Sequence, residues 1–251
     1  MDKISIKTPE DLKIMEEGGS KLGFIKHELA KIIEEGNNAL EIDKLATDLI
    51  EKSGGKSSFK MVPRYSWATC VNVNEGIVHG IPKKETIFKK GDLVSVDVGL
   101  FYKGFHTDTS ISVGISPSLE IEKFLNAGRE AFNSAVKAVK NGNHIHDISE
   151  RIEGVITLYG YSPIEDLVGH GVGRNLHEEP SIPCFVYQKR ENSPRLVEGM
   201  VIAIEVMYAQ GSPRIVKEKD GWTIAMADGK ISGLFEETVA VAASGPQIIT
   251  Q

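Results

Sequence analysis

The sequence is poor in cysteine, in long apolar runs and in charge of a single sign, and each shortage argues against a class of protein. Two cysteines, Cys70 and Cys184, are too few for a disulfide framework or a four-cysteine zinc site. No apolar run approaches the roughly 18 residues of a membrane-spanning helix, and the charged N-terminal residues do not form a secretory signal. The net charge of −6 argues against a protein that chiefly wraps nucleic acid. We therefore expect a cytoplasmic protein with no membrane partner and no direct nucleic-acid recognition.

The remaining composition is that of an ordinary globular protein, since 41% of the 251 residues are hydrophobic and 25% are charged. The segment Thr8-Pro9-Glu10-Asp11 predicts a helix start, and apolar residues at helical spacing continue the helix to a break at Gly36-Asn37-Asn38. A shorter helix is expected over about Glu41 to Lys52, followed by β-rich sequence to about Val113. The same order then returns as a long helix, a short helix and further strands, at about 119–140, 147–159 and beyond.

The two halves of the chain also match in their strands. The segment Lys90–Val98 (KGDLVSVDV) resembles Glu198–Val206 (EGMVIAIEV), and in both an acid follows a glycine by six positions. A second strand, Asp108–Val113, has a counterpart in Glu236–Val241. We interpret the chain as two fused α+β halves related by pseudo-symmetry and packed as one domain, with the halves at about 1–115 and 116–251.

Acidic residues interrupt strands that otherwise look buried. Side chains alternate between the faces of a strand, so in the segment Leu93–Val98 the valines share one face while Asp97 lies on the other. Desolvating one unpaired carboxylate costs several kcal/mol, so a buried acid needs a cation or a proton. Pseudo-symmetry would bring four such acids to one point, at Asp97, Asp108, Glu205 and Glu236.

Two divalent cations would balance the four negative charges of this cluster. The segment GHGVGR offers a neutral nitrogen ligand in His170, because the glycines on either side let the backbone approach closely. A carboxylate-rich site with one imidazole and no thiolate suits Mn, Co, Fe or Zn. The sequence therefore predicts a metal centre with two divalent ions.

Several separated segments, in the same order, resemble the type I methionine aminopeptidases, a family of metallopeptidases with the pita-bread fold. The resemblance covers nearly the whole chain and implies an α+β fold of two pseudo-symmetric halves, with antiparallel sheets backed by helices, in a single catalytic domain over 1–251. The segments that carry it are Val73–Pro82, Val96–Val98, Gly104–Ser110, Gly169–Pro180, Ile204–Met207 and Phe235–Thr238.

The resemblance implies a role for each predicted ligand. Asp97 would chelate the first metal, His170 and Glu205 would hold the second, and Asp108 and Glu236 would contribute to both. In this reading two divalent ions activate a bridging water, which attacks the first peptide carbonyl of a substrate whose free α-amine is bound at one metal.

The resemblance also implies residues that contact the substrate. Glu205 would take up and pass on the proton, His79 would donate a hydrogen bond to the scissile amide, and His177 would stabilise the tetrahedral intermediate. An apolar pocket would accept the methionine side chain, whose soft thioether suits an aromatic and sulfur-bearing wall. Its lining would be Phe59, Tyr65, Cys70 and Trp222.

The implied function is removal of the N-terminal methionine from nascent proteins and peptides with a small second residue. The chain is expected to be a cytoplasmic monomer, with the ribosome as one setting in which it would meet its substrates. Two alternatives stay open: a proline-specific peptidase of the same fold, which usually carries an additional N-terminal domain, and a non-enzymatic binding paralogue, which would be expected to have lost ligands. Four residues differ from those usual in the family and put rate and selectivity in question: Val62, Leu176, Val206 and Glu237.

Other features of the sequence invite readings that we consider weaker. His144 and His146 precede a short helix and are interpreted as solvated loop residues, because no acid or cysteine partner is placed near them. Cys70 as a nucleophile would need a histidine base that the metal reading already uses. The glycines of Gly169–Gly173 do not form a dinucleotide-binding loop, since no strand-turn-helix unit surrounds them.

Overall fold

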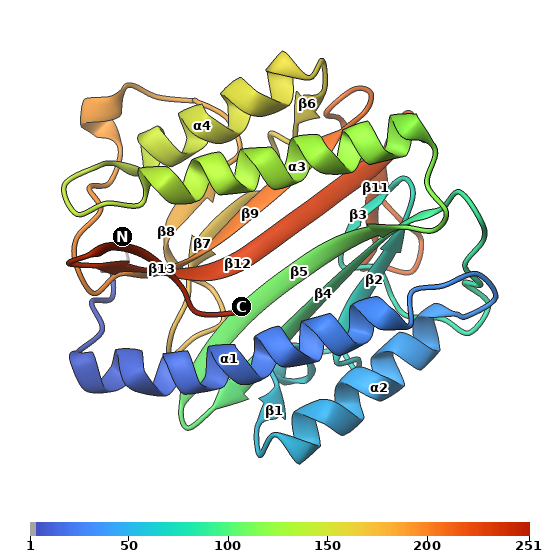
Figure 1. Cartoon of the computed structure of the whole chain (residues 1–251), viewed down its shortest axis with the longest axis horizontal. Helices are drawn as coiled ribbons and strands as arrows, with labels where there is room; N and C mark the ends of the chain where they lie inside the picture. Colours follow the sequence, from blue (N-terminus) through green and yellow to red (C-terminus); the bar gives the residue numbers. More distant parts are fainter. Residues whose placement is uncertain (1–3) are drawn as a thin grey trace.

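The computed structural model describes residues 4–251 as helices packed against a large antiparallel sheet (Figure 1). The helices are α1 (Pro9–Lys31), α2 (Ala39–Lys52), α3 (Leu119–Ala138) and α4 (Ile145–Leu158), with 3₁₀ turns at Phe59–Met61 and Arg190–Asn192. The strands are β1 (Lys56–Ser57), β2 (Thr69–Val73), β3 (Gly76–Val78), β4 (Leu93–Tyr102), β5 (Phe105–Gly114), β6 (Ser162–Pro163), β7 (Val168–Gly171), β8 (Glu178–Pro183), β9 (Val201–Ala209), β10 (Ile215–Lys217), β11 (Ile224–Met226), β12 (Ser232–Ala242) and β13 (Gly245–Ile248).

The large sheet runs through both halves of the chain. Its main path is β1-β4-β5-β12-β9-β7-β8, while β2 pairs with β4, β6 with β9 and β13 with β12. The halves meet where β5 pairs with β12, with Ser110 opposite Glu236 and Thr109 opposite Glu237. Figure 1 shows these two strands side by side between α1 and α3. A residue of one half can therefore lie next to its counterpart in the other.

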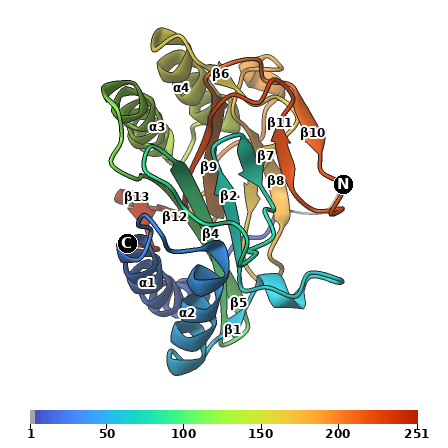
Figure 2. The same ribbon diagram turned by 90° about the vertical axis from the view of Figure 1, so that its right-hand side faces the viewer.

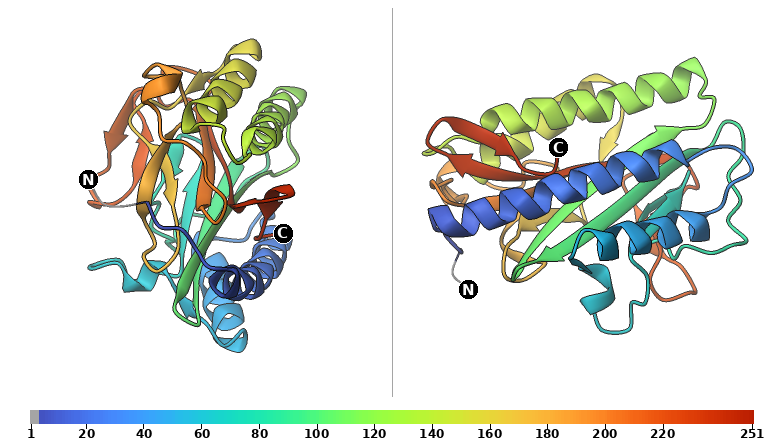
Figure 3. Two further views of the ribbon diagram at one scale, coloured as in Figure 1. Left: turned by 90° about the vertical axis from the view of Figure 1, so that its left-hand side faces the viewer. Right: turned by 60° about the horizontal axis from the view of Figure 1, so that its bottom comes forward.

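The four helices of the described residues cover one face of this sheet. The smaller sheet, β10-β11-β3, lies on the other side (Figures 2 and 3). Val94, Val96 and Val98 pack in one buried cluster with α1 and α2, which confirms the predicted alternation along this strand. Burying a side chain of this size stabilises the fold by about 1.5–3 kcal/mol. Within residues 4–251, no helix is long and apolar enough to cross a membrane.

The predicted α+β class and order of elements are confirmed, but two helices begin earlier than expected. Helix α2 begins at Ala39 because the side-chain oxygen of Asn38 accepts hydrogen bonds from the first turn. Helix α4 begins at Ile145 because Asp147 Oδ2 accepts a hydrogen bond of 2.8 Å from His144 N.

The imidazole rings near the start of α4 are engaged with backbone carbonyls. His144 Nδ1 lies 2.8 Å from Ser193 O, and His146 Nδ1 lies 3.0 Å from Gln188 O. Both residues are half-buried, so the prediction that they are solvated loop residues is wrong. These contacts tie the start of α4 to the segment that follows β8.

Glycines inside α1, which weaken the helix on propensity alone, make room for the end of the chain. A Cβ atom on Gly19 would lie 2.1 Å from Ile249 O, and one on Gly23 would lie 2.7 Å from Thr250 O. No larger residue fits at either position without moving the backbone it meets. The glycines thus allow α1 to lie directly against the segment that follows β13.

Candidate metal centre

The sheet brings three predicted carboxylates into one row across its central strands. Asp97 on β4 is opposite Ser110 on β5, Ser110 is opposite Glu236 on β12, and Glu236 is opposite Glu205 on β9. Asp108 is two residues from Ser110 on the same strand, so alternation places it on the same face. This face is opposite to the one that the helices cover. The convergence of acids from the two halves follows from the pairing of β5 with β12.

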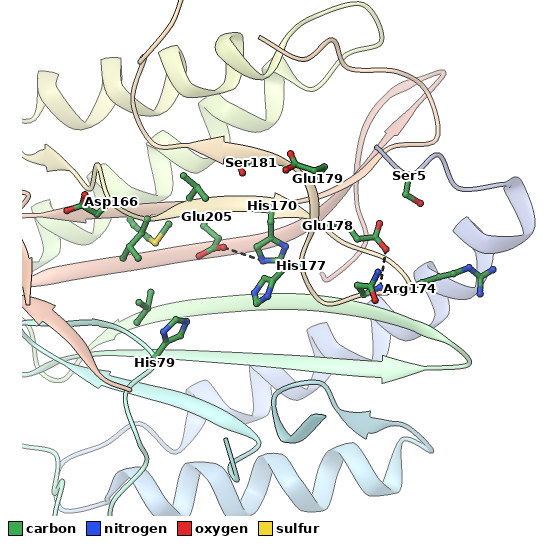
Figure 4. A pocket seen from close by; sticks show the side chains of 15 residues that line it. Ser5, His79, Asp166, His170, Arg174, His177, Glu178, Glu179, Ser181 and Glu205 are labelled. Carbon is green, nitrogen blue, oxygen red and sulfur yellow. Dashed lines mark hydrogen bonds and ion pairs between the residues drawn. The ribbon is translucent and has the colours of Figure 1, made fainter. Parts of the chain in front are cut away.

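His170 joins these acids from β7. One ligand atom from each of Asp108, His170 and Glu236 lies within 4.8 Å of the other two. His170 Nε2 also lies 3.4 Å from Glu205 Oε1, as the dashed line in Figure 4 shows. The other ring nitrogen, Nδ1, is 2.8 Å from Gly171 O. A proton on Nδ1 would donate to that carbonyl and leave the Nε2 lone pair directed at the carboxylates.

Burial makes the charged form of each carboxylate unfavourable. Burial raises the pKa of Asp97 to about 7, although a hydrogen bond with Asp108 partly opposes the shift. Burial and the neighbouring acids raise the pKa of Asp108, Glu205 and Glu236 well above the ordinary range. Burial also lowers the pKa of His170 to about 3, so the imidazole is neutral at pH 7. The cluster needs either protons or cations.

The cluster is suited to divalent cations. Asp97 Oδ1 and Glu236 Oε1 are buried and accept no hydrogen bond from the residues that the structure describes. Such oxygens are costly to bury without a partner, and a cation would satisfy them. The donor set of four carboxylates and one neutral imidazole would balance two divalent charges. The five predicted ligands therefore lie together, and their chemistry fits a metal centre.

Two cavities meet at this cluster. The smaller has a volume of about 160 Å³ and contacts all five predicted ligands. The larger, about 710 Å³, is an open groove lined by residues from both halves (Figure 4). His79, His170, His177 and Glu205 line both. A peptide bound in the groove could thus place the side chain of its terminal residue in the smaller cavity.

The smaller cavity is lined by the four residues predicted to form the methionine pocket. Tyr65 makes edge-to-face contacts with Trp222 and Phe59, at ring-centroid distances of 5.0 and 6.5 Å. Tyr65 Oη donates to the backbone oxygen of Thr69 at 2.9 Å, which fixes the ring. Burial raises the pKa of the Cys70 thiol well above its usual range, so Cys70 stays uncharged and is a poor nucleophile.

Three further side chains contribute to this pocket. Val62 and Leu176, which differ from the residues usual in the family, line the cavity directly. Trp67 packs behind Tyr65 at a centroid distance of 5.3 Å. In the sequence, only the position of Trp67 two residues after Tyr65 indicates that its ring could lie near this pocket.

The two predicted substrate histidines come from different halves. His79 follows β3 with a backbone φ of 58°, and His177 precedes β8. Both rings line the groove beside Glu205 (Figure 4). Burial lowers the pKa of each ring. Each imidazole is therefore neutral at pH 7 and can donate one hydrogen bond and accept another.

Glu237 does not share the face of the carboxylate cluster. It pairs with Lys26 of α1, and it accepts hydrogen bonds from Thr109 Oγ1 at 2.8 Å and Thr250 Oγ1 at 2.6 Å. The negative charge expected beside Glu236 is thus compensated by a buried lysine. Val206, the other departure on a central strand, is fully buried in the core.

Metal-free protein should lose stability as the pH rises from 7 to 8. Carboxyls of raised pKa hold their protons to a higher pH in the folded state than in the unfolded chain, whose acids have already released theirs. Because the unfolded state binds fewer protons, the free energy of unfolding falls with pH, by up to about 1.4 kcal/mol per pH unit for each such carboxyl. Thermal unfolding of chelator-treated protein at pH 7.0, 7.5 and 8.0 measures this slope.

The control for this prediction is Glu236→Gln, which removes one titrating carboxyl and should give a shallower slope. Added Mn²⁺ should stabilise the unsubstituted protein more at pH 8 than at pH 7, because binding then displaces fewer protons. A melting temperature that is constant or rises over this range would contradict the raised pKa values.

Comparison with known proteins places the chain in a family. Residues 13–243 match the profile of metallopeptidase family M24. The chain belongs to this family. It is similar to the methionine aminopeptidase of Clostridium perfringens (strain 13 / Type A), with 36% identity over 248 residues and 98% of each chain covered. The methionine aminopeptidase of Escherichia coli (strain K12) is 32% identical over 250 residues, which cover 98% of this chain and 94% of that one.

Solved structures agree with this membership of family M24. The crystal structure of a methionine aminopeptidase from Thermotoga maritima has a TM-score of 0.96 at 36% identity, covering 99% of this chain and 100% of that one. A prolidase from Pyrococcus furiosus has a TM-score of 0.78 at 24% identity and is covered over 65% of its length, so it shows a shared fold alone. The expected resemblance to type I methionine aminopeptidases and the expected fold class are confirmed.

Proposed function

We propose that this member of family M24 is a metal-dependent aminopeptidase that removes the N-terminal methionine from proteins and peptides with a small second residue. The observation that carries the proposal is the meeting of a small, mostly apolar pocket and an open groove at five potential metal ligands. A pocket of about 160 Å³ beside the ligands suits the side chain of a single residue before the scissile bond. The names of the full-length relatives support this activity over cleavage of bonds to proline.

The proposed ligands are divided as the family resemblance implies. Asp97 would bind one ion, His170 and Glu205 the other, and Asp108 and Glu236 would contribute to both. Two divalent ions, when bound, would supply a Lewis acid for the scissile carbonyl and would lower the pKa of a coordinated water. Cobalt, manganese, iron and zinc are all compatible with this donor set.

The residues around the ligands would orient the substrate and move its proton. Glu205 lines both cavities, so its carboxylate can take up a proton on the groove side and pass it to the leaving nitrogen. Neutral His79 would donate a hydrogen bond to the scissile amide. Neutral His177, across the groove, would donate to the oxygen on which negative charge develops. Phe59, Tyr65, Cys70 and Trp222 would enclose the methionine side chain.

We also propose that residues 1–251 act as a single catalytic domain with halves at about 1–115 and 116–251. The pairing of β5 with β12 supports this, because the ligand cluster spans both halves. The proposed setting is the cytoplasm, where a monomer would process the N-termini of nascent polypeptides, including those emerging at the ribosome.

Two tripeptides test the proposal. Metal-loaded protein should release methionine from Met-Ala-Ser and leave Ala-Pro-Ala intact. Acetylating the α-amine of Met-Ala-Ser should abolish release, which separates an aminopeptidase from a general peptidase. Cleavage of Ala-Pro-Ala instead would favour a proline-specific enzyme, and cleavage of neither peptide with any of the four metals would favour a binding protein.

A further inference from the structure

A buried ion pair ties the segment that precedes α1 to the start of β8. Lys7 is 6% exposed, and its Nζ donates to Glu178 Oε2 at 2.7 Å. The backbone of Lys7 is held as well, because its N–H donates to Gly199 O at 2.8 Å. Burial lowers the pKa of Lys7, while the carboxylate of Glu178 opposes that shift. A lysine that is buried and hydrogen-bonded in this way helps to hold the loop that it contacts.

The loop between β7 and β8 is held closely around this pair. Asn175 N donates to Glu178 Oε1 at 3.0 Å, so the carboxylate accepts from both the loop and Lys7. His106 N donates to Gly173 O at 2.7 Å, which ties the loop to β5. A Cβ atom on Gly173 would lie 2.5 Å from Lys7 Cε. The lysine side chain therefore lies so close to the loop that a larger residue at Gly173 would displace it.

His177 immediately precedes Glu178, but few contacts of its imidazole ring fix the orientation of that ring. Its side chain makes no hydrogen bond with the part of the chain that the structure describes, residues 4–251. The ring packs edge-to-face on His170 at a centroid distance of 4.5 Å and lies toward the groove (Figure 4). The direction of the ring thus depends on the backbone, which is held on one side by the buried Leu176 and on the other by the ion-paired Glu178.

We propose that Lys7 is a positioning residue for the reaction, which acts by clamping Glu178 and thereby fixes the direction of His177. The inference rests on the proposed function, because it takes His177 as the group that stabilises the transition state. Lys7 is not among the residues that line either cavity, and its charge is compensated by Glu178. Its effect on turnover is therefore transmitted through the loop and not through the electrostatic field at the metals.

Steady-state kinetics of Lys7→Met on Met-Ala-Ser test the proposal. We expect kcat to fall about 10- to 100-fold, as for other residues that orient a catalytic group, while KM changes less than about threefold. In a His177→Ala background the same substitution should lower kcat less than about threefold, because the group that it orients is already absent. Effects of Lys7→Met and His177→Ala that multiply would overturn the proposal.

Lys26→Met is the matched control. The Lys26–Glu237 pair is buried to a similar degree, with side-chain exposures of 4% and 15% against 3% and 10% for Lys7 and Glu178, but it lies on the helix face of the sheet. Any effect of Lys26→Met on kcat should multiply with that of His177→Ala. If Lys7→Met does not fold, Glu178→Gln breaks the same ion pair with little change in shape and should give the same result in the His177→Ala background.

Imidazole NMR signals of the metal-free protein give a readout that needs no activity. Lys7→Met should shift or broaden the ring signals of His177 and leave those of His144 and His146 unchanged. Unchanged His177 signals in a folded variant would overturn the proposal. If the unsubstituted protein released no methionine from any peptide, the proposed function would fail, while these spectra would still decide whether Lys7 fixes His177.

Discussion

Replacing Asp108 with asparagine should lower kcat/KM for Met-Ala-Ser at least about a thousandfold, which corresponds to about 4 kcal/mol of transition-state stabilisation. Asp108 is 4% exposed, and its ligand atom lies within 4.8 Å of those of His170 and Glu236. Asparagine keeps the shape but removes one of the negative charges that would balance the two cations. Because even partners outside the ligands account for 10- to 100-fold effects, a ligand that would contribute to both ions should account for more.

Metal analysis shows whether the loss has the proposed cause. Asp108→Asn should bind less divalent metal than the unsubstituted protein at equal free metal concentration. The same variant should be more stable than the unsubstituted protein when both are metal-free at pH 8, since one buried acid with a raised pKa is gone. Full metal content together with full activity would show that Asp108 is not a ligand.

Asp43→Asn is a matched control for this substitution. Asp43 is also a buried carboxylate, but its Oδ1 accepts hydrogen bonds from Ala68 N at 2.7 Å, Thr69 N at 2.9 Å and Thr69 Oγ1 at 3.0 Å. The protein itself satisfies this acid, so the substitution should reduce stability and leave the metal content intact. The comparison separates the loss of a ligand from the loss of any buried charge.

The convergence of the carboxylates could be predicted from the sequence because it depends on local rules. Alternation along β4 and β9 fixes which face Asp97 and Glu205 occupy, and the internal repeat indicates that the two strands occupy equivalent places. The sequence did not specify the register between the strands of the two halves. The structure shows it, because Ser110 lies opposite Glu236. Neither alternation nor the repeat specifies how far apart the ligand atoms lie.

The surroundings of the cluster could not be predicted in this way, because they depend on contacts between residues far apart in the chain. Lys26 and Glu237 are separated by 211 positions and Lys7 and Glu178 by 171. No periodicity relates the members of such pairs. In the sequence Glu237 directly follows Glu236, whereas the structure pairs it with Lys26 on the other face.

Replacing His79 with alanine should lower kcat about 10²- to 10⁴-fold and leave the metal content unchanged. His79 lines both cavities but is not among the clustered ligand atoms. Burial lowers the pKa of its ring, so at pH 7 the neutral imidazole offers one N–H to the substrate amide and carries no charge that would repel the cations. Turnover and metal content of the variant should be measured on the same samples.

The control for His79→Ala is His27→Ala, because His27 lies exposed on α1, on the opposite side of the sheet from the cluster. His27→Ala should leave kcat within about twofold of the unsubstituted value, as expected for a surface substitution away from special features. An unchanged kcat in His79→Ala would remove the role of His79 at the scissile amide. A fall in metal content parallel to the fall in kcat would instead make His79 a ligand, and the donor set of the centre would have to be extended by a second imidazole.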